Sequence, residues 1–323
     1  MDYVLGIDGG GTKTICIISD IEGRLLGGGI SGASNYLTVG EQSAAESIRE
    51  AVEEAFERSR IKVQKVKLAY LGMAGAGRPS GVKVIRRIME GLNIAEKVVI
   101  DIDASIALAG ATACKPGVVV ISGTGSIAFG VNGKGETSRS GGWGYLLGDE
   151  GSGFEIGRKG LIAAFRAYDG RGEGTILLNK FMSRFEAGNI GDLLDRIYSA
   201  GLRVDEVSSL APVVIEAARE GDVVSRKILE EAVEELSLSA ITVIKNLNME
   251  DEEFELALMG GIFKAEDLIS LPVQKKIKNY APKCRVVAPK FKPVVGAVLK
   301  ALKELNVPID SSLLSSVKAT LQN

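Results

Sequence analysis

Histidine is absent from the 323-residue sequence. This absence removes the side chain that proteins use most often as a general base and as a metal ligand. Mechanisms based on a Ser-His-Asp triad or a Cys-His pair are therefore excluded, together with His-ligated zinc and haem sites. If the protein is an enzyme, its base must be a carboxylate, a lysine, a tyrosine or a cysteine.

Cysteine is also scarce. Cys16, Cys114 and Cys284 lie far apart in the sequence, and no Cys-x-x-Cys pair occurs. Three is an odd number, which argues against a disulfide framework and indicates a reducing compartment. The sequence begins without the charged segment and apolar core of a secretory signal. No apolar run approaches the roughly 18 residues that cross a membrane. We expect a cytoplasmic protein with no membrane association.

Neither sign of charge is in excess. Lys and Arg number 39 against 41 Asp and Glu, a formal net charge of −2. Because nucleic-acid-binding proteins normally carry a basic excess or basic clusters, no nucleic-acid partner is expected. The 46% hydrophobic and 25% charged residues exclude a disordered, collagen-like or coiled-coil chain. The length favours about two domains.

Glycine is abundant, with 40 residues where an average frequency of about 7% would give roughly 23. These glycines gather in short segments, at 9–11, 27–29, 75–81, 123–135, 141–153 and 260–261. Clustered glycine between apolar segments indicates a tightly turned backbone or a backbone that closely approaches a ligand.

Apolar segments with strand and helix patterns alternate along the chain, which is typical of the α/β class. The pattern predicts strands at 3–8, 14–20, 25–30, 67–74, 97–101, 118–122, 127–131, 254–259 and 284–288. It predicts helices at 41–59, 81–90, 103–112, 223–247, 266–278 and 293–305, within a mostly helical stretch from 155 to 247.

One arrangement occurs twice. Residues 3–20 and residues 118–131 each consist of a strand, a turn of small residues with a threonine, and a second strand. The two copies lie about 115 residues apart, on either side of a seam at 115–117. We interpret them as an internal duplication that divides the chain into two related domains, 1–115 and 116–296.

The first turn, between Asp8 and Thr14, is not a Walker A loop. Thr12 stands between Gly11 and Lys13, and a strand rather than a helix follows. Two readings remain: an ordinary hairpin, or a hairpin whose exposed N–H groups cradle phosphate. Three consecutive glycines favour the second reading. Asp8, at the end of the strand, would then hold Mg²⁺ through water.

The second turn fits G-x-G-x-x-A over residues 123–128. A dinucleotide-binding fingerprint requires a helix after this motif. The following residues predict a strand, so a second phosphate-binding hairpin is favoured.

Asp101 and Asp103 flank the end of a predicted strand, and Asp103 begins the next helix. Asp103 is either a plain N-cap or a general base that points into the site, in a position where the helix dipole favours a carboxylate.

Residues 140–153 contain the single tryptophan, Trp143, among six glycines and beside two carboxylates. The segment is either a glycine-rich surface loop packed by Trp143 or a sugar-binding loop. The short segment 34–36 is a weaker signal of the same kind and by itself favours a turn.

Together these motifs resemble the sugar-kinase and ATPase superfamily with the actin and Hsp70 fold. Within it, the chain is similar to the N-acetylglucosamine kinase group, also called the BadF/BadG/BcrA/BcrD ATPase family. Residues 6–14 and 121–126 look like its two phosphate motifs, 101–105 like its connecting motif and 256–263 like its adenosine motif. Residues 141–153 look like a stretch specific to hexosamine kinases.

The resemblance implies two ribonuclease H-like (actin-like ATPase) domains with a cleft between them, the smaller one completed by the C-terminal helix at about 297–323. It implies a general base at Asp103 and Mg²⁺ at Asp8. The implied nucleotide-binding residues are Gly10, Gly11, Thr12, Lys13, Gly123, Thr124, Gly125, Gly260 and Gly261. The implied sugar-binding residues are Asn35, Asp103, Gly142, Trp143, Gly144 and Asp149.

The activity that the resemblance implies is an ATP- and Mg²⁺-dependent kinase, a homodimer, that phosphorylates N-acetylglucosamine or a related hexosamine or hexose at its 6-hydroxyl. One alternative is a broad hexokinase that also accepts glucose, glucosamine and N-acetylmannosamine. Another is an ATPase that activates a 2-hydroxyacyl-CoA dehydratase or benzoyl-CoA reductase, which would need a cysteine-ligated iron–sulfur cluster. The third is a non-catalytic sugar-binding regulator, which usually loses the aspartate or a phosphate motif.

Overall fold

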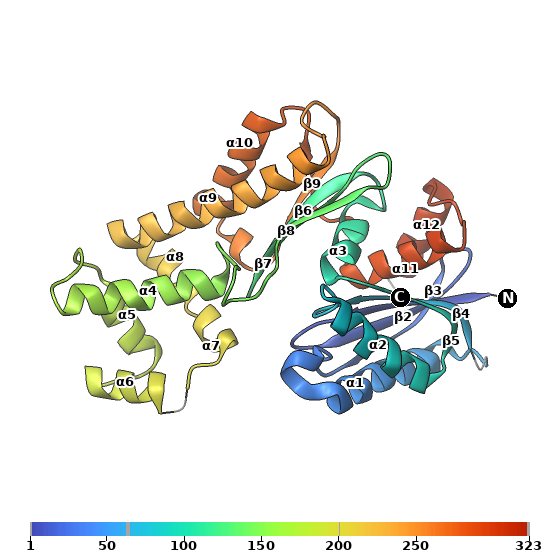
Figure 1. The fold of residues 1–323 in the computed structure, drawn as a ribbon, viewed down its shortest axis with the longest axis horizontal. Helices are drawn as coiled ribbons and strands as arrows, with labels where there is room; N and C mark the ends of the chain where they lie inside the picture. Colours follow the sequence, from blue (N-terminus) through green and yellow to red (C-terminus); the bar gives the residue numbers. More distant parts are fainter. Residues whose placement is uncertain (1, 63–64, 200, 322–323) are drawn as a thin grey trace. The chain divides into compact units, whose positions relative to one another are not determined.

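The computed structural model describes residues 2–62, 65–199 and 201–321. The chain forms two compact units (Figure 1). Unit 1 contains Met1–Gly117 and Val287–Asn323, and unit 2 contains Val118–Val286. Residues 287–296, which the sequence analysis placed in the larger domain, belong with unit 1 because helix α11 (Pro293–Glu304) packs on the sheet of that unit.

Unit 1 is built on a five-stranded mixed sheet. Its strand order is β3-β2-β1-β4-β5, with β1 at Tyr3–Gly9, β2 at Thr14–Asp20, β3 at Leu25–Ser31, β4 at Val66–Met73 and β5 at Ala95–Asp101. Strands β1, β4 and β5 run parallel, and their register aligns Asp8 with Gly72 and Gly72 with Asp101. Asp8 and Asp101 therefore lie at the same end of the sheet, where the three parallel strands have their carboxyl ends.

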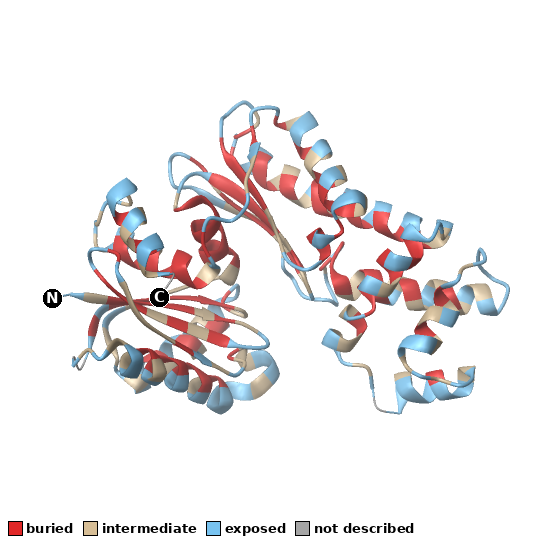
Figure 2. Cartoon of the chain, turned by 180° about the vertical axis from the view of Figure 1, so that it is seen from behind, coloured by how far each residue is buried: buried red, intermediate tan, exposed pale blue. Residues whose placement is uncertain are grey.

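Helices cover both faces of this sheet (Figures 1 and 2). On one face lie α1 and α2, and on the other lie α3, α11 and α12. These elements are α1 at Tyr36–Ser59, α2 at Pro79–Leu92, α3 at Asp103–Thr112 and α12 at Ser311–Thr320. Along β1, Leu5 and Ile7 point into the core beneath α1 and α2, and Val4 points into the core beneath α3, α11 and α12. Side chains of a strand alternate between the two faces in this way.

Unit 2 contains a second five-stranded mixed sheet with the order β10-β9-β6-β7-β8. Its strands are β6 at Gly117–Ser122, β7 at Ser126–Val131, β8 at Thr137–Gly141, β9 at Glu255–Met259 and β10 at Arg285–Val286. Its α-helices are α4 at Gly153–Tyr168, α5 at Leu177–Arg184, α6 at Ile190–Tyr198, α7 at Val204–Ser208, α8 at Ala211–Arg219, α9 at Val223–Asn246 and α10 at Leu271–Tyr280. The long helix α9 packs on β7 and β8 and closes the core.

The α/β class is confirmed, with differences at individual elements. Strand β8 was not predicted, because its sequence, TSRSG, contains no apolar residue and so shows no hydrophobic alternation. Helix α1 begins at Tyr36 instead of 41, since a left-handed glycine at position 40 (φ 80°) interrupts its pattern. The helix predicted at 266–278 is a π-helical turn, Glu266–Ser270, followed by α10. Helix α12 was not predicted as an element of its own.

Candidate functional site

The first glycine turn joins β1 to β2. The Gly10 N–H donates to the Lys13 carbonyl at 3.0 Å, whereas the N–H groups of Gly11, Thr12 and Lys13 have no acceptor in the described part of the chain. A Cβ at Gly10 would meet nothing closer than 3.5 Å, and one at Gly11 nothing within 4 Å. The fold itself therefore does not require these two glycines. A backbone left open to a ligand does explain them, and unclaimed N–H groups are what a phosphate nest supplies.

Asn35 is attached to this turn. The Gly10 carbonyl accepts the N–H groups of Ser34 and Asn35, at 3.1 and 3.2 Å. Asn35 is the N-cap of α1, and its Oδ1 accepts the Leu37 N–H at 3.2 Å. Residues 34–36, where the sequence by itself favours a turn, instead form the start of helix α1. Sugar binding by Asn35 stays a prediction. The cap uses only the Oδ1 of Asn35, so its amide nitrogen is available to a ligand.

Asp101 is fully engaged by the fold. Its Oδ2 accepts the Tyr70 hydroxyl at 2.7 Å and the Lys300 ammonium at 3.0 Å, and its Oδ1 accepts the Ile102 N–H at 2.8 Å. Burial alone would raise the pKa of Asp101, but Lys300 and the hydrogen bonds from Tyr70 and Ser105 outweigh it and lower that pKa. Sequence reasoning missed this network, because Lys300 lies on α11, far along the chain.

Asp103 has a different environment. It is the first residue of α3, and the N-cap position is Ile102, so the reading of Asp103 as a plain N-cap is wrong. Its Oδ1 accepts the Ala104 N–H at 2.8 Å, and no cation among the described residues pairs with it. Burial raises the pKa of Asp103 and Asp101 adds to this effect, against the lowering by backbone N–H groups. An unpaired, partly buried carboxylate with a raised pKa is a good proton acceptor.

Asp8 is electrostatically coupled to the same group. Burial, together with the nearby Asp103 carboxylate, raises the pKa of Asp8 to about 6, while Lys13 of the turn lowers it. Asp8, Asp103 and Lys13 therefore gather at the end of β1.

These residues fit a magnesium ion bound largely through its own water. The Asp103 carboxylate raises the pKa of Asp8, and a divalent cation beside the two groups would relieve this repulsion. Mg²⁺ usually takes one or two protein carboxylates, with waters and substrate phosphates completing its shell. Among the described residues no group of three or more Cys, Asp or Glu side chains is arranged to hold a metal, and Mg²⁺ bound with a nucleotide does not need one.

The second glycine turn, between β6 and β7 of unit 2, is held from behind by α4. The carbonyls of Gly123 and Thr124 accept the N–H groups of Gly153 and Phe154 at 2.8 and 3.3 Å. The N–H groups of Thr124 and Gly125 have no acceptor in the described ranges. Because the first N–H groups of α4 are used within the protein, donors for phosphate at this turn are those of the turn itself.

Asp149 packs directly on this turn. It has a left-handed backbone (φ 64°) and is 9% exposed. Its Oδ1 accepts the Ser126 N–H at 3.2 Å, and a Cβ on Gly125 would lie 2.8 Å from its Oδ2. Burial raises the pKa of Asp149, against the lowering by the Ser126 N–H. The Asp149 side chain thus has a structural role in this turn. Its contact with sugar stays a prediction.

Trp143 does not pack into the core, since it is 52% exposed. The guanidinium of Arg139 on β8 lies over its ring, 4.2 Å from the centroid. Gly142 and Gly144 on either side have left-handed backbones, with φ of 70° and 86°. A Cβ on Gly142 would also lie 2.7 Å from Ile127. Sequence reasoning missed Arg139, because nothing in the motif marks it.

The predicted adenosine motif lies next to the second turn. Gly260, just after β9, has φ 105°, and a Cβ there would lie 2.1 Å from the Ser122 carbonyl. Only glycine fits this approach. A Cβ on Gly261 would meet nothing within 4 Å. The end of β6, the second turn and Gly260–Gly261 are therefore neighbours within unit 2.

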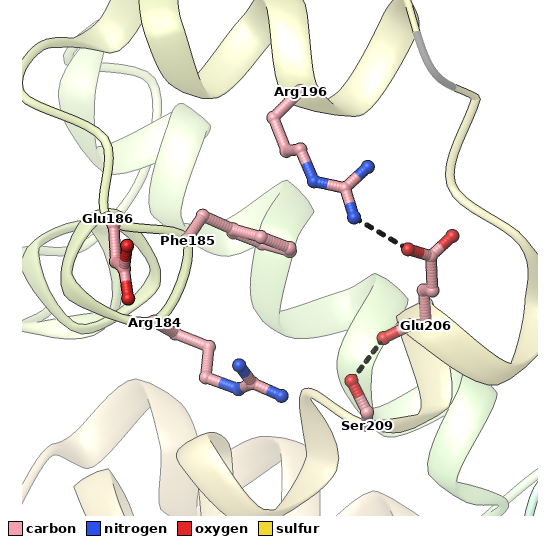
Figure 3. A pocket seen from close by; sticks show the side chains of 6 residues that line it. All are labelled: Arg184, Phe185, Glu186, Arg196, Glu206 and Ser209. Carbon is pink, nitrogen blue, oxygen red and sulfur yellow. Dashed lines mark hydrogen bonds and ion pairs between the residues drawn. The ribbon is translucent and has the colours of Figure 1, made fainter.

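A hollow of about 210 Å³ lies elsewhere in unit 2 (Figure 3). Its lining contains none of the residues predicted from the sequence, and consists of Arg184, Phe185, Glu186, Arg196, Glu206 and Ser209. Arg196 is paired with Glu206 at 2.7 Å. No part of the candidate site rests on this hollow. In the described ranges, no helix combines the length and apolar character needed to cross a bilayer.

Two units that each place a glycine turn between the opening strands of a five-stranded mixed sheet define the actin-like ATPase class, as expected. A solved structure from Chromobacterium violaceum, provisionally named an N-acetylglucosamine kinase, superposes with a TM-score of 0.76. It is 26% identical and covers 94% of this chain and 99% of its own.

The chain belongs to the BadF/BadG/BcrA/BcrD ATPase family, whose model matches residues 5–301. It is 36% identical to an N-acetylmuramic acid/N-acetylglucosamine kinase of Clostridium acetobutylicum, over 94% of this chain and 99% of the relative. It is 35% identical to an N-acetyl-D-glucosamine kinase of Dictyostelium discoideum, over 93% and 98%. The chain is accordingly a phosphotransferase that uses ATP, as the sequence analysis expected.

Proposed function

We propose that the protein phosphorylates N-acetylglucosamine, or a related hexosamine or hexose, at the 6-hydroxyl. The observation that carries the proposal is the contrast at the end of β5, where Asp101 is neutralised by Lys300 and Asp103 is left unpaired with a raised pKa. In a chain without histidine, a carboxylate of this kind is one of the few side chains that can act as a general base. The names of the two curated relatives support an amino-sugar acceptor.

In the proposed reaction a sugar hydroxyl attacks the γ-phosphorus of ATP in line, and Asp103 accepts the hydroxyl proton. The bond from the γ-phosphorus to the β–γ bridging oxygen breaks, and ADP leaves. Phosphoryl transfer depends mainly on positioning and on neutralising charge. The unclaimed N–H groups of residues 11–13 and 124–125 would donate to phosphate oxygens, and Lys13 would add a positive charge. Asp8 would hold Mg²⁺ through water, and the ion would neutralise the charge that develops on the phosphates.

The remaining predicted residues divide between the two ligands. On the nucleotide side, Thr12 and Thr124 would bind phosphates through their hydroxyls, and Gly260 and Gly261 would pack on the adenine or ribose. The sugar would be bound by Asn35, Asp103, Gly142, Trp143, Gly144 and Asp149. The half-exposed ring of Trp143 offers an apolar face of the kind that a sugar ring can cover.

A coupled assay of ADP release with a panel of sugars tests the proposal. N-acetylglucosamine should give the highest kcat/KM among N-acetylglucosamine, N-acetylmannosamine, glucosamine and glucose. ADP release that no sugar stimulates would overturn the proposal and favour an ATPase. Comparable values for glucose and N-acetylglucosamine would favour the broad hexokinase instead.

The iron–sulfur alternative receives no support from the cysteines. Cys16 and Cys284 are buried in the cores of different units, and burial raises the pKa of the Cys16 thiol, which disfavours a thiolate ligand. The homodimer and the cytoplasmic location stay predictions, and light scattering of the purified protein tests the first of them.

A further inference from the structure

Arg139 has an unusual position in unit 2. It lies on β8 opposite Phe129 of β7, so the hairpin fixes its backbone. Its side chain is partly buried and stacks on Trp143, with 4.2 Å between the guanidinium carbon and the ring centroid. A guanidinium that lies over an aromatic face can still use the N–H donors of its planar fork for hydrogen bonds to a ligand.

The charge of Arg139 is uncompensated. Two other cations in the described ranges stack on aromatic rings, and each also binds a carboxylate: Arg196 pairs with Glu206 at 2.7 Å and Lys300 pairs with Asp101 at 3.0 Å. Arg139 forms no such pair with any described residue.

Asp149 and Glu150 are the acidic groups of the neighbouring segment. The Asp149 carboxylate is directed to the Ser126 N–H, and neither group lies within ion-pair distance of Arg139. An oriented guanidinium without an acidic partner is suited to bind a carboxylate from a ligand.

We propose that Arg139 binds the carboxylate of an acidic amino sugar, and that the substrates include N-acetylated hexosamines that carry a lactyl ether, as N-acetylmuramic acid does. The proposal rests on the proposed function, because it assumes that Trp143 lines the sugar site. N-acetylmuramic acid is N-acetylglucosamine with a 3-O-lactyl group, so a single charged substituent distinguishes the two sugars. The Clostridium relative, which is named for both sugars, is consistent with a site that accepts this substituent.

The test measures kcat/KM for N-acetylmuramic acid, its methyl ester and N-acetylglucosamine. In the wild-type protein the free acid should exceed the neutral ester by roughly tenfold, since charge-assisted hydrogen bonds are about twice as strong as neutral ones. Arg139→Gln should lower the ratio of the acid to N-acetylglucosamine by about tenfold or more and abolish the preference for acid over ester. Arg139→Lys, which keeps the charge but loses the planar fork, should give an intermediate ratio.

Lys134→Gln is the matched control, because it removes a positive charge from the turn of the same hairpin, where Lys134 has no ion pair with a described residue. It should leave the acid-to-ester ratio unchanged. Wild-type protein that phosphorylates N-acetylglucosamine but shows no preference for the acid over the ester would overturn the role of Arg139 and leave the proposed function intact. Failure to phosphorylate both of these sugars and also N-acetylmannosamine, glucosamine and glucose would overturn the proposed function as well. Because the ester comparison uses wild-type protein, it can overturn the proposal even if an Arg139 variant fails to fold.

Discussion

The two glycine turns occupy equivalent places in their sheets, but their surroundings differ. The turn at 10–13 adjoins ionisable groups, Asp8 and Asp103, and its own glycines are free of steric constraint. The turn at 123–126 is covered by Asp149 and by the start of α4. Turns at equivalent places in two sheets therefore differ in what surrounds them: the first lies beside the proposed base, and the second is packed against other segments of its own unit.

The prediction with the largest effect concerns the chemical side of this comparison. Asp103→Asn keeps the size of the side chain but removes the proton acceptor, so turnover should fall by roughly 10²–10⁴. The affinities for ATP and sugar, measured by calorimetry, should stay within a few-fold. A variant that keeps more than about a tenth of wild-type turnover would show that Asp103 is not the base.

Both turns should act on ATP rather than on sugar. Thr12→Val and Thr124→Val each remove one hydroxyl at nearly constant volume. Each should raise the KM for ATP by roughly three- to tenfold, the worth of about one hydrogen bond, with a smaller effect on the KM for sugar. If either variant weakens sugar binding alone, that turn has been assigned to the wrong ligand.

Alanine substitutions in the two turns should change the free energy of unfolding by different amounts. Gly125→Ala would bring a Cβ to 2.8 Å from the Asp149 carboxylate, so we expect a loss of about 1–3 kcal/mol in the free energy of unfolding. Gly11→Ala meets nothing within 4 Å, so its stability should change by less than about 1 kcal/mol. Urea unfolding of both variants measures the difference. Equal losses would show that the first turn is as constrained as the second.

Asp101 and Asp103 form a matched pair for stability. Asp101→Asn removes a carboxylate whose pKa is lowered and which accepts hydrogen bonds from Tyr70 and Lys300. The free energy of unfolding should fall by about 1–3 kcal/mol at neutral pH. Because the folded pKa of Asp101 is depressed, its stabilisation is present above the unfolded pKa of about 3.9 and is lost as pH falls through the folded value. The difference from wild type should therefore shrink below about pH 4.

Asp103→Asn is the control for this measurement. Its folded pKa is raised, so the ionised form destabilises the folded state and the neutral amide should cause no loss at neutral pH. A loss as large as that of Asp101→Asn would mean that Asp103 is paired after all.

The smallest expected effect is spectroscopic. Trp143 is the single tryptophan, and the residue is 52% exposed. Saturating sugar should shift or quench its emission, and ATP alone should do so less. If no hexosamine perturbs the emission at millimolar concentration while catalysis proceeds, Trp143 lies away from the sugar.

Sequence patterns predicted most of the sheets and both turns, because strand alternation and glycine clusters are local signals. They also located Asp103, but they could not distinguish its role from that of Asp101. That distinction comes from Lys300 and Tyr70, which approach Asp101 from other elements. Asp149 was chosen for its motif, and its packing on Gly125 is a tertiary contact that no periodicity reveals. Strand β8 was missed because it has no apolar residues to alternate, and Arg139 was missed because nothing in the glycine-rich motif marks it.

Transfer of the γ-phosphoryl group to a sugar hydroxyl, with Asp103 as the base, can be observed directly. Phosphorus NMR of wild-type protein with ATP, Mg²⁺ and N-acetylglucosamine observes the transferred group itself, and Asp103→Asn run in parallel supplies the comparison. Wild-type protein should produce ADP and a sugar 6-phosphate in equal amounts. Asp103→Asn should produce neither above background. Inorganic phosphate in place of the sugar phosphate, or equal rates for the two proteins, would contradict this mechanism.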